Sequence, residues 1–146
     1  MVGAAIVIGD RCLVGKRPAG GAYGGLWEFP GGKLKEDELP HAALIREIEE
    51  ELGIAITPIE LLARGQATSF AHEITLDVYM ATMDFPEQSI LQREHDELRF
   101  CSADELKELA WAPADLPALP RLKVLLSQMD AAPLPTIEQG ISKLQR

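Results

Sequence analysis

Residues 41–52 combine an apolar stripe and an acidic face within one short segment that the sequence predicts to be a helix. Gly53 follows directly, and glycine at this position is a typical helix stop. Residues three and four apart share a helix face, which places Glu47, Glu50 and Glu51 together and turns Glu49 elsewhere. The stripe expected to pack on a core consists of Leu44, Ile45, Ile48 and Leu52. The chain must therefore bury one side of this helix while three carboxylates converge on another.

Short apolar segments separated by turn residues flank this helix on both sides. Their β-branched and aromatic residues favour strands, and the glycines and prolines between them favour turns. Ser102 and Glu105 form a capping-box pattern, which predicts a helix from there to Leu109. A further helix is expected over 119–129, and the predicted strands are 3–8, 11–16, 27–29, 54–59, 61–68, 74–83 and 98–101. Strands interleaved with helices in this way indicate an α+β domain, or an α/β/α layered one.

The remaining segments are expected to be turns and loops. Proline and paired glycines end the strand at 27–29 with a turn over 30–32, and loops are predicted over 17–26, 33–40, 86–92 and 111–117. No linker splits the chain, so residues 1–130 are assigned to one domain. Residues 131–146, which contain two prolines, are expected to form a loosely packed tail.

Composition narrows the class of partner. The chain has 146 residues, of which 47% are hydrophobic, and this suffices for one core. A formal net charge of −9 argues against binding a nucleic acid polymer or an anionic membrane. No apolar run is long enough to cross a bilayer, and no basic leader marks a secretory signal. Cys12 and Cys101 lack CxxC spacing and are expected to be reduced core thiols, which predicts a cytoplasmic protein. The protein is expected to be either a monomer or a homodimer.

The acidic helix face has two interpretations. A run of exposed glutamates is usually just solvated, although like charges at this spacing cost a helix roughly a few tenths of a kcal/mol per pair. Three features favour a metal site instead: the carboxylates share a defined face, a Gly-Gly pair precedes the helix, and Arg46 adjoins the first glutamate. Converging hard oxygen ligands suit Mg²⁺, with Mn²⁺ as a substitute. Such a cation would also reconcile the acidic net charge with a phosphate substrate.

The spacing of these residues resembles the Nudix box. Gly32 is followed after five residues by Glu38, and after seven more by Arg46-Glu47. The segment then continues through Glu50-Glu51 to Gly53, with aliphatic residues in the two aliphatic slots. Every fixed position of the 23-residue motif is matched. The resemblance implies a Nudix fold, which is an α/β/α sandwich with a central mixed β-sheet, and a pyrophosphohydrolase that depends on Mg²⁺.

The resemblance also implies a role for each position of the box. Glu47, Glu50 and Glu51 would bind the metal, and Glu47 would also orient or deprotonate the attacking water. The Gly31 carbonyl would complete a metal site. The catalytic set further includes Glu38, which would support the metal ligands, and Arg46, which would hold the glutamates in place. Lys33 would meet a phosphate or remain a mobile surface lysine.

A second stretch is similar to the MutT subgroup of the family. Residues 26–33 read Leu-Trp-Glu-Phe-Pro-Gly-Gly-Lys, close to that subgroup's habitual sequence. Glu94 lies six positions before Phe100, where the subgroup has a metal-binding glutamate before a tryptophan. Glu94 is therefore the expected additional metal ligand and Glu97 the alternative, although either acid would also suit a solvated loop.

The nucleotide is expected to contact residues outside the box. Asp115 matches the position that meets the purine edge in MutT-like enzymes, or else it caps the segment that follows it. Phe29 would stack on a base or belong to the core. Arg17 and His72 complete the predicted substrate-binding set, while His95 is expected to be a bystander or a local hydrogen-bonding partner.

The resemblance sets the reaction class more firmly than the substrate. The MutT-like features imply hydrolysis of 8-oxo-dGTP or a related (d)NTP, including a cytidine nucleotide, to the monophosphate and pyrophosphate. Hydrolysis of ADP-ribose, a dinucleoside polyphosphate or a nucleotide sugar is the enzymatic alternative. A binding module without catalysis is the third interpretation, which the complete box disfavours.

Overall fold

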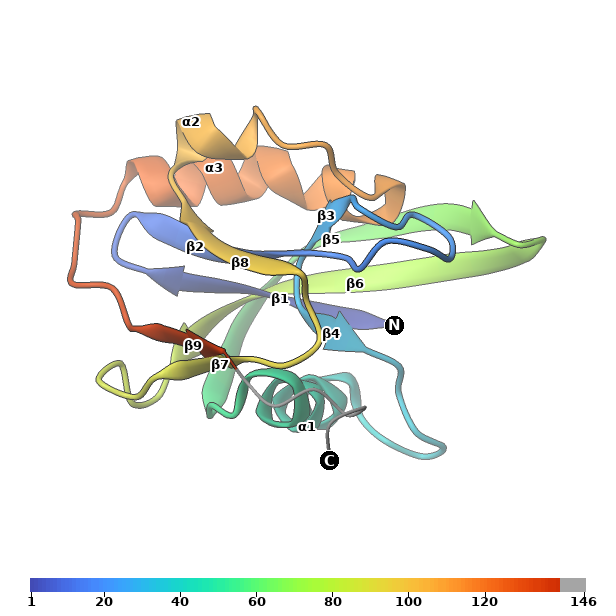
Figure 1. Ribbon diagram of the computed structural model, residues 1–146, viewed down its shortest axis with the longest axis horizontal. Coiled ribbons are helices and arrows are strands. Elements are labelled where there is room, and N and C mark those ends of the chain that lie inside the picture. Colours follow the sequence, from blue (N-terminus) through green and yellow to red (C-terminus); the bar gives the residue numbers. More distant parts are fainter. Residues whose placement is uncertain (140–146) are drawn as a thin grey trace.

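The computed structural model describes residues 1–139 and is built around a mixed β-sheet (Figure 1). The central path runs β3 (Trp27–Glu28), β2 (Arg11–Lys16), β1 (Val2–Ile8), β6 (His72–Met83) and β5 (Ile56–Ser69). The pairing of β1 with β6 is parallel, whereas β2 and β5 pair antiparallel with their neighbours. Two further strands attach to this path, β4 (Gly31–Gly32) to β1 and β8 (Glu97–Cys101) to β2.

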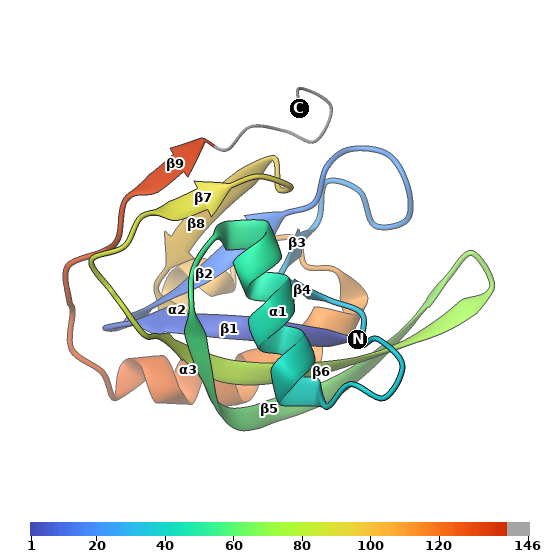
Figure 2. The ribbon, with the colours of Figure 1, turned by 90° about the horizontal axis from the view of Figure 1, so that it is seen from below.

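Helices cover both faces of the sheet (Figures 1 and 2). On one side lies α1 (Pro40–Leu52), and on the other lie α2 (Ala103–Leu106), the 3₁₀ helix η1 (Pro113–Ala118) and α3 (Leu119–Ser127). All seven residues of β1 are buried, because its alternating side chains serve both layers. Ala4 and Ile6 pack with the α1 side, and Ala5 and Val7 with the α3 side. The predicted α/β/α sandwich is thereby confirmed.

The acidic helix forms close to its predicted bounds, beginning at Pro40 and ending at Leu52. Gly53 adopts the left-handed conformation, with φ 69°, and its N–H donates to the Glu49 carbonyl. The buried side differs from the predicted stripe. Ile45 is 38% exposed and the assignment of this residue to the core was wrong, whereas Glu51 is buried on the inward side. Ile45 directly follows Leu44 and therefore lies about 100° around the helix from it, at the edge of the buried face.

Several predicted boundaries also change. Gly31-Gly32 pairs with β1 instead of forming only a turn, and residues 56–69 form one strand whose register shifts near Pro58 and again near Leu61. The capping box forms, yet α2 ends at Leu106. The expected loop over 111–117 contains η1. Within residues 1–139 no helix is long and apolar enough to span a membrane.

The segment after residue 130 contributes a strand that the sequence did not predict. β9 (Ile137–Gln139) pairs in parallel with β7 (Ile90–Gln92), which lies in an expected loop. Ile137 packs against the α1-side core, so this part of the tail is paired and in contact with the domain. Residues 140–146 of the predicted tail lie outside the described residues.

The two isoleucines of α1 provide a test of this packing. Ile48→Ala removes a fully buried side chain and is expected to lower the free energy of unfolding by about 2–5 kcal/mol. Ile45→Ala, on the exposed flank of the same helix, is expected to cost less than about 1 kcal/mol. Urea unfolding followed by circular dichroism measures both, and equal losses would contradict the assigned orientation of the helix.

Candidate active site

Arg46 is the hub of the acidic cluster on α1. Its guanidinium makes two hydrogen bonds to the Glu38 carboxylate, at 2.9 and 2.8 Å. Its Nη1 lies 3.0 Å from Glu47 Oε1 and 3.4 Å from both carboxylate oxygens of Glu50. Nη2 also donates to the Lys33 carbonyl, which ties the preceding loop to the helix. The Arg46 guanidinium thus holds three acidic side chains and the loop before α1 together.

The charges of this cluster are strongly coupled. Hydrogen bonds from Arg46 and then from the Lys35 N–H lower the pKa of Glu38 to about 2. Hydrogen bonds to Glu38, and then to Glu47 and Glu50, raise the pKa of Arg46 against the opposing effect of desolvation. Glu38 therefore stays ionised at neutral pH and remains paired with Arg46.

The glycine pair of β4 leaves the space into which the helix acids project. A Cβ on Gly32 would lie 2.5 Å from Glu47 Oε2, which is too close for any real contact. A Cβ on Gly31 would collide with the Val2 carbonyl of the neighbouring strand. Gly31 is thus needed for the close pairing of β4 with β1, and a side chain at Gly32 would displace the Glu47 carboxylate from this position.

Glu51 points from the buried side of the helix toward a cavity. Its residue is 8% exposed, and its Oε2 has no hydrogen-bond partner within the described chain. Burial raises the pKa of Glu51 to about 9, and the charges of Glu94, Glu28 and Glu47 add to this shift. A hydrogen bond from the Gly31 backbone opposes this shift but does not offset it, and a bound cation would stabilise the ionised form further.

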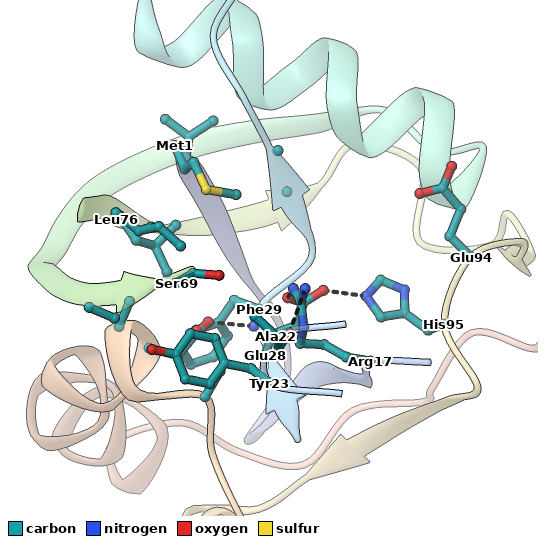
Figure 3. A pocket seen from close by; sticks show the side chains of 18 of the residues that line it. Met1, Arg17, Ala22, Tyr23, Glu28, Phe29, Ser69, Leu76, Glu94 and His95 are labelled. Atoms are coloured by element: carbon teal, nitrogen blue, oxygen red, sulfur yellow. Dashed lines mark hydrogen bonds and ion pairs between the residues drawn. The ribbon is translucent and has the colours of Figure 1, made fainter. Parts of the chain in front are cut away.

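The cavity has a volume of about 340 Å³ and runs from Glu51 to Asp115. Segments far apart in sequence line it: the loop after β2, the strands β3 and β4, the outer part of the β5–β6 hairpin, the Glu94 loop and η1 (Figure 3). Tyr23 closes the hairpin side, where its hydroxyl donates to the Thr68 carbonyl. The end near Glu51 and the end near Asp115 thus belong to one continuous cavity.

Glu28 joins two of these walls. Its Oε1 accepts a 2.6 Å hydrogen bond from Arg17 Nη1, and its Oε2 lies 2.9 Å from His95 Nε2. Burial alone would raise the pKa of Glu28, but the hydrogen bonds and charges of His95 and Arg17 outweigh it and lower the pKa. Glu28 is therefore a carboxylate with both oxygens occupied. The buried Nε of Arg17 has no partner within residues 1–139.

Asp115 stands at the other end of the cavity and is only 4% exposed. Its Oδ1 accepts a 2.9 Å hydrogen bond from the Phe29 N–H, so Asp115 bonds across to β3 and does not cap its own segment. Phe29 is buried and packs on Trp111, with 4.9 Å between the ring centroids. Burial raises the pKa of Asp115 to about 7, against the opposing hydrogen bond from Phe29.

The donor set at the acidic end fits a divalent cation. Glu51 and Glu94 line this end of the cavity, and their carboxylates are hard oxygen ligands. The Glu50 carboxylate is exposed on the same helix as Glu51 and does not line the cavity itself. Within residues 1–139 no three His, Cys, Asp or Glu side chains already form a metal-binding group. Glu47 and Glu50 instead face Arg46, so binding a cation would draw their oxygens from that guanidinium.

The structure brings most of the predicted site residues to one region. Those lining the cavity are Arg17, Phe29, Gly31, Glu51, Glu94 and Asp115, and those joined through Arg46 are Glu38, Glu47 and Glu50. Lys33 is exposed, and only its carbonyl enters the network. His72 is exposed at the start of β6 and does not line the cavity.

Sequence reasoning missed Glu28 and Tyr23, and it treated His95 as no more than a local partner. Glu28 directly precedes Phe29 in the motif-bearing stretch, which is the one signal that pointed to it. Tyr23 and His95 lie in loops whose positions depend on contacts distant in sequence.

Comparisons with known proteins agree with this geometry. A sequence model described as NUDIX domain matches residues 2–122. The CTP pyrophosphohydrolase of Escherichia coli K12 is 40% identical over 117 residues, or 80% of this chain and 85% of that protein. A putative 8-oxo-dGTP diphosphatase 2 of Mycobacterium tuberculosis is 35% identical over 116 residues, 79% and 81% of the two chains. The solution structure of the E. coli ORF135 protein aligns with TM-score 0.70 and 34% identity, covering 90% of this chain and 92% of that one.

Asp115 predicts a pH dependence of stability. A carboxyl whose pKa rises on folding binds its proton more tightly in the folded state, so its contribution to the free energy of unfolding falls as pH rises from about 4 to about 7. Asp115→Asn keeps an acceptor for the Phe29 N–H and removes the charge. It is expected to gain about 1–3 kcal/mol over the native chain at pH 8 and little at pH 4.5.

Guanidinium unfolding at the two pH values measures this difference. Asp130→Asn, at an exposed position, is the matched control. An Asp115→Asn difference that is the same at both pH values would contradict the raised pKa.

Proposed function

The chain belongs to the Nudix family, and we propose that it is a Mg²⁺-dependent nucleoside triphosphate pyrophosphohydrolase that acts on 8-oxo-dGTP or a related (d)NTP, including cytidine nucleotides. The observation that carries this proposal is the single cavity that joins the carboxylate of Glu51 to that of Asp115. A triphosphate chain fits the first end once a cation is present, and a base fits the second. The names of the two relatives support the same choice of substrates.

At the acidic end, the residues that would hold Mg²⁺, or Mn²⁺ in its place, are Glu47, Glu50, Glu51, Glu94 and the carbonyl of Gly31. The bound metal supplies charge neutralisation and a Lewis acid for the phosphate chain. Glu47 orients or deprotonates the attacking water from its place against Gly32. Arg46, fixed by Glu38, keeps the helix glutamates from repelling one another and limits how far they move.

At the base end, Asp115 has one oxygen engaged by the Phe29 N–H and a second available to the nucleotide. Its raised pKa lets it accept or donate a hydrogen bond near neutral pH, which suits a base edge presenting both kinds of group. Arg17 also lines the cavity and adds a cationic donor group on this side of it. We also propose a cytoplasmic location, which the two buried free thiols support.

Removing single carboxylates tests the metal-binding assignment. Glu47→Gln and Glu50→Gln are each expected to lower kcat by about two orders of magnitude or more, because a neutral amide replaces an anionic ligand. Glu49→Gln, at an exposed position of the same helix, is the matched control. Pyrophosphate release with Mg²⁺ and thermal unfolding are measured for all three variants. Native turnover in both folded test variants would remove these residues from the site.

A substrate panel tests the proposed reaction. With Mg²⁺, the chain is expected to release pyrophosphate and monophosphate from 8-oxo-dGTP or a cytidine triphosphate at least about tenfold faster than from dGTP, in line with one or two base contacts. ADP-ribose and diadenosine tetraphosphate complete the panel, with monophosphate followed in parallel. Asp115→Ala is expected to change the ranking of bases more than the turnover of a generic triphosphate. Preference for ADP-ribose or the dinucleotide would overturn the substrate.

A further inference from the structure

The loop that carries Glu94 is attached to the domain at several separate points. Arg93 Nη1 donates to the Glu50 carbonyl at 3.0 Å, which ties the loop to the last turn of α1. The Asp96 N–H donates to the Lys16 carbonyl at the end of β2, also at 3.0 Å. Between these two points stand Glu94 and His95, and Figure 3 shows their side chains leaving the loop in different directions, with His95 directed at Glu28.

His95 is the buried member of these attachments. Its side chain is only 4% exposed, although the residue borders the cavity. Its Nε2–H donates to Glu28 Oε2 at 2.9 Å, and the other oxygen of Glu28 holds Arg17. A hydrogen-bonded chain thus runs from the backbone beside Glu94 to the guanidinium on the nucleotide side of the cavity.

Gly15 in β2 leaves the space that the His95 ring occupies. A Cβ on Gly15 would lie 2.7 Å from His95 Nε2 and closer still to Cδ2, so any larger residue would displace the imidazole. Gly15 is also the cross-strand partner of Glu28. The ring therefore rests on bare backbone beside the carboxylate that it binds, and its orientation is fixed by contact as well as by the hydrogen bond.

We propose that His95 is a positioning residue that places Glu94 at the metal end of the cavity by anchoring the loop to Glu28. This inference rests on the proposed function, because it assigns Glu94 to the metal site. The anchoring requires a donor at the Nε2 position that reaches Glu28, and the absence of a side chain at Gly15 leaves the space for the group that carries this donor. In this role His95 acts through Glu28 and through the backbone that it shares with Glu94.

The first test replaces the ring with matched side chains. His95→Phe keeps a ring but removes the donor, and His95→Gln keeps a donor near the Nε2 position. Mn²⁺ binding is measured by electron paramagnetic resonance on the protein without nucleotide, so the result does not depend on turnover. We expect His95→Phe to raise the Kd for Mn²⁺ about tenfold or more, as loss of a residue that orients a metal ligand does. His95→Gln and the exposed control His41→Phe are expected to stay within about twofold of the native value.

The second test moves the ring without changing any side-chain donor or acceptor. Gly15→Ala is expected to weaken Mn²⁺ binding like His95→Phe, whereas Gly3→Ala, whose Cβ would make ordinary contacts at 3.5 Å, is the control. Gly15→Ala decides the question if His95→Phe does not fold, as judged by circular dichroism.

Native Mn²⁺ affinity in a folded His95→Phe or Gly15→Ala protein would overturn the proposal. So would equal loss in His95→Phe and His95→Gln, or the absence of Mn²⁺ binding in the native chain. A native chain that binds Mn²⁺ and shows these variant effects but leaves nucleoside triphosphates intact would overturn the proposed function alone.

Discussion

Repulsion among carboxylates at the carboxyl-terminal half of α1 is the constraint on which the site depends. Glu47, Glu50 and Glu51 are displayed by one helix, and Glu51 is buried where water cannot screen its charge. Arg46 offsets the exposed part of this cost by binding Glu38, Glu47 and Glu50 together. It does not reach Glu51, whose Oε2 remains without a partner in the described chain. The fold therefore stabilises most of the cluster internally and leaves the buried carboxylate dependent on a cation.

The sequence predicted the parts of the fold that local rules determine. The period of α1, the stop at Gly53 and the Ser102–Glu105 capping box all follow from contacts within a few residues. Ile45 was misplaced because it lies at the edge of the apolar face, where the helix period alone does not decide whether a side chain is covered. The pairing of β7 with β9 was missed for a related reason, since its partners lie more than forty residues apart and neither carries a strong strand pattern.

The candidate site divides in the same way. The resemblance to the box identified the Arg46 cluster, and helix geometry accounts for one of its pairs, because Arg46 and Glu50 are four residues apart on α1. Asp115 was placed by resemblance, but its bond to the Phe29 N–H links residues 86 positions apart and could not be derived from spacing. The role of His95 was underestimated because its partner Glu28 lies 67 positions away. The space for its ring also comes from Gly15 in β2, which is distant from it in the sequence. These contacts join residues that are far apart in the sequence, and the periodicity of the sequence does not predict them.

The short stretch from Glu28 to Gly32 connects the two ends of the cavity. Glu28 binds Arg17 and His95, the Phe29 N–H holds Asp115, and the glycines of β4 leave space for Glu47. Each of these contacts uses a different group of the same five residues, whose backbone is fixed by pairing with β1 and β2. A displacement of this backbone would move the Asp115 end and the acidic end together. The distance between the two ends is therefore set by one segment held in the sheet, which is what the proposed substrate, with a base at one end and a phosphate chain at the other, would require.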